Sequence, residues 1–343
     1  MVLQNRGHRK RFQQWILSRL QSSPTSFARW VALLELGIFE AGLTGDASQR
    51  HFHIIWIGYV QCFLERECTS SSEIQNRRQD WIYVMLLKIM VGQTPYVYQV
   101  LRSVTSVFLE LVFSNPTLWP TDSNITHVPI LNVLTLGSHE VAAFVLMDCV
   151  SAMAFGLPQQ VEYDTTTHSR LPSPSHQWSH DTPIEFQVAL VDINAYRDNS
   201  PTARDWREIE NLLLTWQSRP GEYTFTDSWM SITCASSDDL RIQSYVKQLL
   251  QVLGTVKKHE SSGAEISFLV QYLMAGICAR NEAHRKAVRD VLVETREAKF
   301  WFIPGSDFVP ALDHLWHGAA VDGHPIKWID YIRSRQAKLP IVV

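Results

Sequence analysis

The sequence of 343 residues is poor in glycine and proline, with 15 of each. Chains rich in β-structure and disordered chains usually contain more of both, so neither class is expected. Cysteine is also scarce, and the five residues are an odd number that lie mostly in apolar, helix-like runs. This favours buried free thiols in a reducing compartment over disulfides. The five are Cys62, Cys68, Cys149, Cys234 and Cys278.

The chain also lacks an excess of charge and a long apolar run. Its formal net charge of -3 gives no overall electrostatic footprint for nucleic acid. The apolar run 141–155 is too short to span a membrane and contains Asp148, and the run 81–113 is interrupted by charges and by Pro95. No uninterrupted apolar region follows the basic start, so we expect neither a membrane span nor a secretory signal.

What the sequence does contain, almost everywhere, is helical periodicity. No alternating strand pattern and no Asn-Gly hairpin signal competes with it. We therefore predict an all-α fold, a large irregular array of roughly a dozen helices, in one domain over residues 1–343. The polar stretch 159–181 is predicted to be an internal connection. The predicted helices cover residues 12–20, 26–41, 51–67, 72–88, 95–113, 138–155, 206–216, 237–258, 266–280, 283–297, 309–317 and 326–335, with one more starting at Pro183.

One predicted helix carries an isolated acid. Ser138 can cap its start, Gly156 and Pro158 end it, and Asp148 lies in the middle of the apolar segment VLMDCVSAM. A buried carboxylate is costly unless it is paired or protonated. We expect a hydrogen bond from Asp148 to a neighbouring helix rather than catalysis. Asp148→Ala should then destabilise the fold by roughly 1–3 kcal/mol.

Two short motifs suggest metal sites. His314 and His317 could share a helix face, with Asp313 and His324 nearby, but zinc usually needs a third protein ligand, so solvated histidines are favoured. The pair Asp238-Asp239 resembles the start of a terpene-cyclase metal motif. A helix start is the better interpretation, because Ile242 stands where that motif needs a carboxylate.

No nucleophile elbow, phosphate loop or dinucleotide fingerprint is present. The basic run Arg6 to Arg11 could be a nuclear address, a phosphate contact or a solvated arm. The sequence therefore predicts no catalytic, cofactor-binding or metal site, and no cofactor.

Several segments in order resemble the regulatory "fungal-specific transcription factor" region of fungal Zn2Cys6 proteins, in its basidiomycete form. In that family a helix with an aspartate and small residues ends in a Gly-x-Pro turn, followed by an acidic-aromatic step, here Tyr163-Asp164. The resemblance runs from about Leu134 onward. Its other segments are EFQVALVDIN, DWREIENLLLTWQSRP, FLVQYLMAGICARNEAHR, FVPALDHLWHGAA and IDYIRSRQAKLPI.

The chain departs from this family in two ways. The family's zinc cluster has Cys-x2-Cys-x6-Cys spacing, which is missing here, so the resemblance carries over no DNA-contact residues. The stretch 222–238 is shorter than in relatives, which could leave a gap in the core and an exposed apolar surface.

The resemblance implies a non-catalytic regulatory domain of a nuclear transcription regulator. Its partners would be the transcription machinery or a DNA-binding regulator, and a small-molecule effector is a further partner that the family implies. Sequence-specific DNA binding and membrane binding are not expected of this chain. Two alternatives stay open at this stage: an all-α enzyme with an apolar pocket of the terpenoid-processing type, and a truncated gene product without an independent role.

Overall fold

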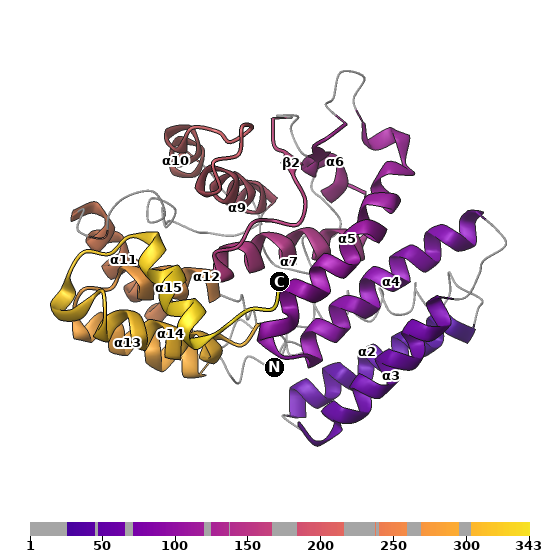
Figure 1. The fold of residues 1–343 in the computed structure, drawn as a ribbon, viewed down its shortest axis with the longest axis horizontal. Coiled ribbons are helices and arrows are strands. Elements are labelled where there is room, and N and C mark those ends of the chain that lie inside the picture. The colour runs from indigo at the N-terminus through magenta and orange to yellow at the C-terminus, as the bar shows by residue number, and fades with distance from the viewer. Residues whose placement is uncertain are drawn as a thin grey trace.

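The computed structural model describes residues 26–44, 47–65, 71–119, 125–136, 138–166, 184–215, 237, 240–258, 269–294 and 303–343. Within these ranges it contains 13 α-helices and two short parallel strands (Figure 1). The predicted all-α class is therefore confirmed. That the whole chain is one domain stays a prediction.

The α-helices follow one another along the chain with these bounds. They are α2 (Ser26–Thr44), α3 (Arg50–Leu64), α4 (Ser71–Val91), α5 (Val97–Phe113), α6 (Ile130–Leu134), α7 (His139–Phe155), α9 (Ile184–Arg197), α10 (Trp206–Leu214), α11 (Leu240–Lys258), α12 (Leu269–Cys278), α13 (Glu282–Glu294), α14 (Val309–His317) and α15 (Trp328–Lys338). The strands are β1 (Val128–Pro129) and β2 (Tyr163–Asp164), and 3-10 turns include η3 (Thr94–Tyr96), η8 (Gly305–Phe308) and η9 (Val321–Gly323).

Helix α7 is the central helix of the fold. Every residue from Glu140 to Phe155 is buried, and a helix that is buried all round must be surrounded by others. It packs against α4, α5, α6, α9 and α12. Both predicted ends are confirmed: the Ser138 hydroxyl accepts a hydrogen bond from the Val141 N–H, and Gly156 adopts the left-handed conformation, with φ of 62°.

The apolar interior forms two clusters. The larger surrounds α7 and reaches from α4 and α5 to α15. The smaller lies between α2, α3 and one face of α4, and includes Val31, Ile57 and Leu87. Figure 1 places α2 and α3 at one margin of the molecule and α11 to α15 on the opposite side of α7.

Helix α5 is amphipathic. Among the described residues, one helical stretch, Thr94–Phe113, is long and apolar enough to cross a membrane by length and composition. In this stretch α5 packs on α4 and α7, and its residues Leu101, Val104 and Phe108 are buried in the larger core. Arg102 lies on the exposed side of the helix. A buried core helix meets the same criterion.

The polar connection after α7 is partly buried in its described part, up to Thr166. Val161, Tyr163 and Thr165 are buried in alternation, and β2 pairs in parallel with β1, with Val128 opposite Tyr163. The alternation over Val161 to Thr165 spans only five residues, which is too short to predict a strand of two residues from the sequence.

Two other predicted helix starts agree with the structure to within one residue. Helix α10 begins at Trp206, where Asp205 caps it, because its carboxylate accepts a hydrogen bond from the Arg207 N–H. Helix α4, predicted from residue 72, begins at Ser71.

Several predictions lie outside the described residues. They are the helix over 12–20, the basic run Arg6 to Arg11, Cys68, Cys234, the pair Asp238-Asp239 and all of the compressed stretch 222–238 except Ser237.

Candidate functional site

Asp148 is the buried acid at the centre of the fold. Its side chain accepts hydrogen bonds from the Gln160 N–H at 2.7 Å, the Val161 N–H at 3.3 Å and the Tyr163 hydroxyl at 3.1 Å. All three donors belong to the segment that follows the Gly-Leu-Pro turn. The expected buried partner is therefore real, but it lies on this segment and not on a neighbouring helix. The turn at Gly156 brings the chain back along its own helix, a path that periodicity does not reveal.

Burial controls the protonation of this acid. The desolvation of a fully buried carboxyl group raises the pKa of Asp148 to about 7, although the three hydrogen bonds act in the opposite direction. Burial, followed by the charge of Asp148, raises the pKa of Tyr163 well above its ordinary value. The pair binds the turn to α7 and presents no open face to solvent, so we interpret it as structural.

Residues of helix α9 form hydrogen bonds with the C-terminal part of α7. Asn194 donates to the Cys149 carbonyl at 3.0 Å. Arg197 donates to the carbonyls of Ala152 at 2.9 Å and Leu157 at 2.7 Å. A cation at the end of a helix satisfies its last carbonyls and complements the negative end of its dipole. Arg197 therefore fixes the C-terminus of α7 against α9.

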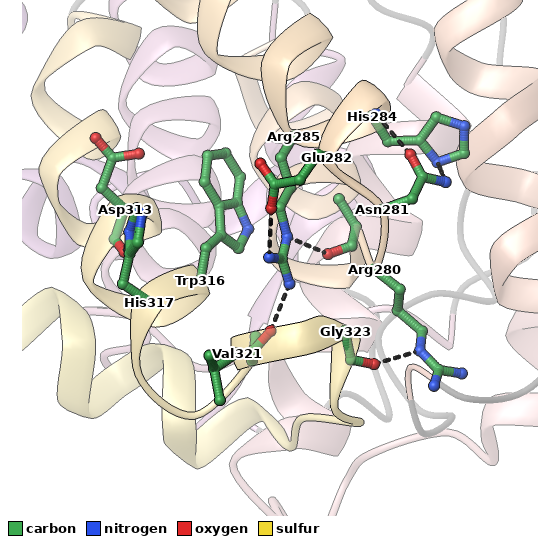
Figure 2. A network of polar contacts seen from close by, with 12 residues as sticks. Arg280, Asn281, Glu282, His284, Arg285, Asp313, Trp316, His317, Val321 and Gly323 are labelled. Carbon is green, nitrogen blue, oxygen red and sulfur yellow. Dashed lines mark hydrogen bonds and ion pairs between the residues drawn. The ribbon is translucent and has the colours of Figure 1, made fainter.

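A second polar network joins α12, α13 and α14, and Arg285 is its centre (Figure 2). Only 3% of this residue is exposed. Its guanidinium donates to the Ala279 carbonyl at 3.1 Å, the Ala320 carbonyl at 2.5 Å and the Glu282 carboxylate at 2.9 Å. The planar fork of an arginine suits several acceptors at once. Arg285 thereby connects the α12–α13 junction to the turn after α14.

Trp316 packs beside two arginines of α13. Its ring centroid lies 5.9 Å from the Arg285 guanidinium and 5.2 Å from that of Arg289, one helical turn further on. Its indole N–H donates to the Gly276 carbonyl at 2.9 Å. Arg289 also pairs with Asp313 on α14, with 3.0 Å between its Nε and a carboxylate oxygen. Cation–π contacts and this ion pair hold α13 and α14 together.

The backbone at Arg280, between α12 and α13, also lies close to the backbone at Gly323 in η9. Arg280 donates through Nε to the Gly323 carbonyl at 2.7 Å. Gly323 has φ of 72°, and a Cβ there would lie 2.7 Å from the Arg280 carbonyl oxygen. A side chain at this position would clash and be strained, so the turn requires glycine.

The three histidines considered as a possible metal site do not converge on one point. His314 bonds to the Ser334 hydroxyl, His317 to the Asp313 carbonyl and His324 to the Val321 carbonyl. Within the described ranges, no group of three or more His, Cys, Asp or Glu residues is placed to hold a metal. Cys62, Cys149 and Cys278 are free thiols, and the last two are buried as expected.

The network around Arg285 was missed by sequence reasoning. The spacing of Arg285 and Arg289 places both on one face of α13, which could have marked them as a pair. Their partners Ala320 and Trp316 come from later in the chain, and the sequence alone does not bring these segments together.

Comparison with curated proteins and with solved structures gave no match. Comparison with protein-family models gave a match over residues 228–341, roughly the last third of the chain. This span contains α11 to α15 and the Arg285 network. The resemblance predicted back to Leu134 is not covered by this match and stays a prediction upstream of residue 228. Residues 228–341 are thus similar to the family described as "Fungal specific transcription factor domain".

Proposed function

We propose that this chain is a non-catalytic regulatory module of a transcription regulator, and that it acts in the nucleus through contacts with other proteins. The observation that carries the proposal is the family match over 228–341. Fold alone does not establish function, since helical arrays serve many purposes, so this step rests on family similarity.

The chemistry of the described polar centres supports a regulatory role. Arg285 donates to two backbone carbonyls and to a carboxylate on its own helix, and Arg289 pairs with Asp313. Asp148 binds the segment that follows its own helix. An active site needs acids, bases or nucleophiles that are open to a substrate. Here the charged groups bind their own chain, which suits a scaffold that positions surfaces for partners.

DNA contact is assigned to a partner in this proposal. Sequence readout needs side chains that a docking element places at base edges. The formal net charge of -3 offers no broad phosphate-binding surface to position such an element. The module would then pass a signal, such as the binding of an effector, to a regulator that binds DNA.

A tethering assay tests the proposal. The full chain is fused to an unrelated DNA-binding domain in yeast cells that carry a matching reporter gene. We expect reporter expression to rise or fall at least several-fold relative to the DNA-binding domain alone. Arg285→Met should abolish the change because it removes the bonds that join α13 to the turn after α14.

A matched control is Lys286→Met, which also replaces a cation on α13 with methionine but at an exposed position. This variant should keep the effect on the reporter. A fusion protein that accumulates in nuclei at normal levels and leaves the reporter unchanged would refute the regulatory role.

A further inference from the structure

The outer surface of α2 and α3 is apolar and exposed. Phe52 and Tyr59 are 66% and 73% exposed, which is unusual for such large rings. We refer to the whole surface as the α2–α3 apolar face. It consists of the exposed residues Trp30, Leu33, Phe52, Ile55, Tyr59 and Phe63, together with Trp56, which is partly buried against the smaller core.

Helical spacing places these residues on one continuous face. On α3, Phe52, Ile55, Tyr59 and Phe63 recur every three or four residues and therefore lie along one line. The side of α3 that faces the smaller core is a different one, formed by residues such as Ile57 and Val60. Helix α3 thus has two apolar sides. The one formed by Ile57 and Val60 is buried in the smaller core, whereas Phe52, Ile55 and Tyr59 on the other remain exposed.

Two tryptophans join the α2 and α3 parts of this face. The ring centroids of Trp30 and Trp56 lie 5.4 Å apart. In the described part of the chain, α2 and α3 pack mainly on each other and on α4. Figure 1 shows helices α2 and α3 at the margin of the molecule, beyond α4. The face therefore points away from the rest of the described fold.

The face carries almost no charge. Helix α3 contains one charged residue, Arg50, and no carboxylate. Arg50 donates to the carbonyls of Val91 and Gly92, so it binds the end of α4. An ordinary surface helix turns charged side chains toward water. This face instead presents mainly rings and aliphatic groups. The one cation placed beside it is the Arg77 guanidinium of α4, which lies over the Phe63 ring, 5.7 Å from its centroid.

The size of the face matches one half of a protein interface. A large aromatic side chain has about 150–250 Å² of surface, so the exposed fractions here amount to roughly 600 Å². The largest apolar patch on an ordinary monomer is about 300–600 Å². One side of a standard interface covers about 800 Å², part of which is a polar rim. Two such faces would therefore supply the apolar centre of a stable dimer.

We propose that two copies of this chain associate through the α2–α3 apolar face. In a two-fold dimer the same surface meets itself, so a charged face would bring like charges together. An aromatic face whose neighbouring cation, Arg77, lies only at the Phe63 end largely avoids this repulsion and is complementary to itself. The α2–α3 pair of each copy would pack on that of the other as a four-helix arrangement. This inference is independent of the role in transcription.

The first test measures the mass of the full chain in solution over a range of concentrations, by sedimentation equilibrium. We expect the wild type to approach twice the chain mass of 39.4 kDa. The double variant Phe52→Glu/Tyr59→Glu should be monomeric, with a dissociation constant raised at least about thirtyfold, the scale of a hot-spot residue. Circular dichroism checks that the variant folds, which is expected because both side chains point away from the core.

Two further variants make the test specific. Ile125→Glu introduces the same charge at another exposed apolar position, 70% exposed on the turn before β1, and should remain dimeric. A chain with Phe52→Lys/Tyr59→Lys should be monomeric alone. It should form a mixed dimer with the double glutamate variant, because the two faces then carry opposite charges.

Two outcomes would overturn the proposal. The first is a wild type that stays monomeric at its highest soluble concentration. If Tyr59 is then protected from chemical modification, another part of the same chain covers the face. The second is a dimer whose stability is unchanged in the double glutamate variant, because such a dimer must use another surface.

Discussion

Asp148 allows a sharp test of how burial sets the stability of the core. The substitution is Asp148→Asn, which keeps the shape of the side chain and removes its ionisation. The folded protein holds the pKa of Asp148 at about 7, whereas the ordinary value is 3.8. Between these values the folded protein keeps the proton and the unfolded chain releases it. Unfolding therefore releases a proton, and a rise in pH favours the unfolded state.

The size of this loss of stability follows from the difference between the folded and unfolded pKa values of Asp148. Below pH 4 both states are protonated and the stability contribution of Asp148 is largest. As the pH rises from about 4 to about 7, the wild type loses about 1.4 kcal/mol per pH unit through this group. The total loss is of the order of 4 kcal/mol, and above pH 7 no further change is expected.

In the asparagine variant, residue 148 does not titrate and so adds no pH dependence to the free energy of unfolding. Its single carbonyl oxygen can accept one of the backbone N–H bonds of Gln160 and Val161, so it loses about 1 kcal/mol at low pH. Near pH 4, where the wild type has lost only about 0.6 kcal/mol through this group, it should still be the more stable protein. By pH 5 its loss exceeds that of the asparagine variant, and at pH 8 the variant should be the more stable by about 3 kcal/mol. Asp148→Ala, which leaves all three donors without their acceptor, should be less stable than the wild type at pH 4 or below by roughly 1–3 kcal/mol.

The assay is urea unfolding followed by tryptophan fluorescence at pH 4, 5, 6, 7 and 8, in all three proteins at one ionic strength. Other titrating groups affect the wild type and its variants alike, so the difference between the curves isolates Asp148. Parallel curves for wild type and Asp148→Asn would refute the raised pKa of this carboxyl group.

Four further outcomes are expected. Arg285→Met should lower the free energy of unfolding by roughly 2–4 kcal/mol, because two buried carbonyls lose their donor; a change below the error of a urea titration would contradict this. Arg335 is 3% exposed and its Nε has no hydrogen-bond partner, so Arg335→Met should change stability by less than about 1 kcal/mol or raise it, as thermal unfolding would show. In anisotropy titrations at physiological salt the chain should show only weak, salt-sensitive affinity for DNA, and tight binding to one duplex that survives a scrambled competitor would disprove this. Elemental analysis should find no stoichiometric zinc, and two zinc ions per chain would contradict the expectation drawn from the isolated cysteines.

The helices were predictable because their signals are local. The ends of α7 follow from Ser138 and Gly156, and both act as the sequence indicates. The burial of Asp148 was also predictable, since its neighbours on all sides of the helix are apolar. These features depend on residues within one or two helical turns.

The partners of these residues were not predictable in the same way. Asp148 binds the chain 12 to 15 residues later, because a left-handed residue at Gly156 reverses the direction of the backbone. Arg285 binds the Ala320 carbonyl, 35 residues away. Helical periodicity shows which side of a helix is apolar, and it does not show what that side meets.

Helix α3 shows this limit most clearly. Its sequence RHFHIIWIGYVQCFL is apolar on nearly every side, which predicts complete burial. In the described fold His53, Ile57, Val60 and Leu64 are buried, while Phe52 and Tyr59 remain in solvent. The compressed stretch 222–238 predicts an exposed apolar surface, whereas this one lies on the N-terminal helices α2 and α3. Since a helix that is apolar on two sides needs two partners, and Phe52, Ile55 and Tyr59 of α3 stay exposed in the described fold, the composition of α3 is itself an argument for an interface between molecules.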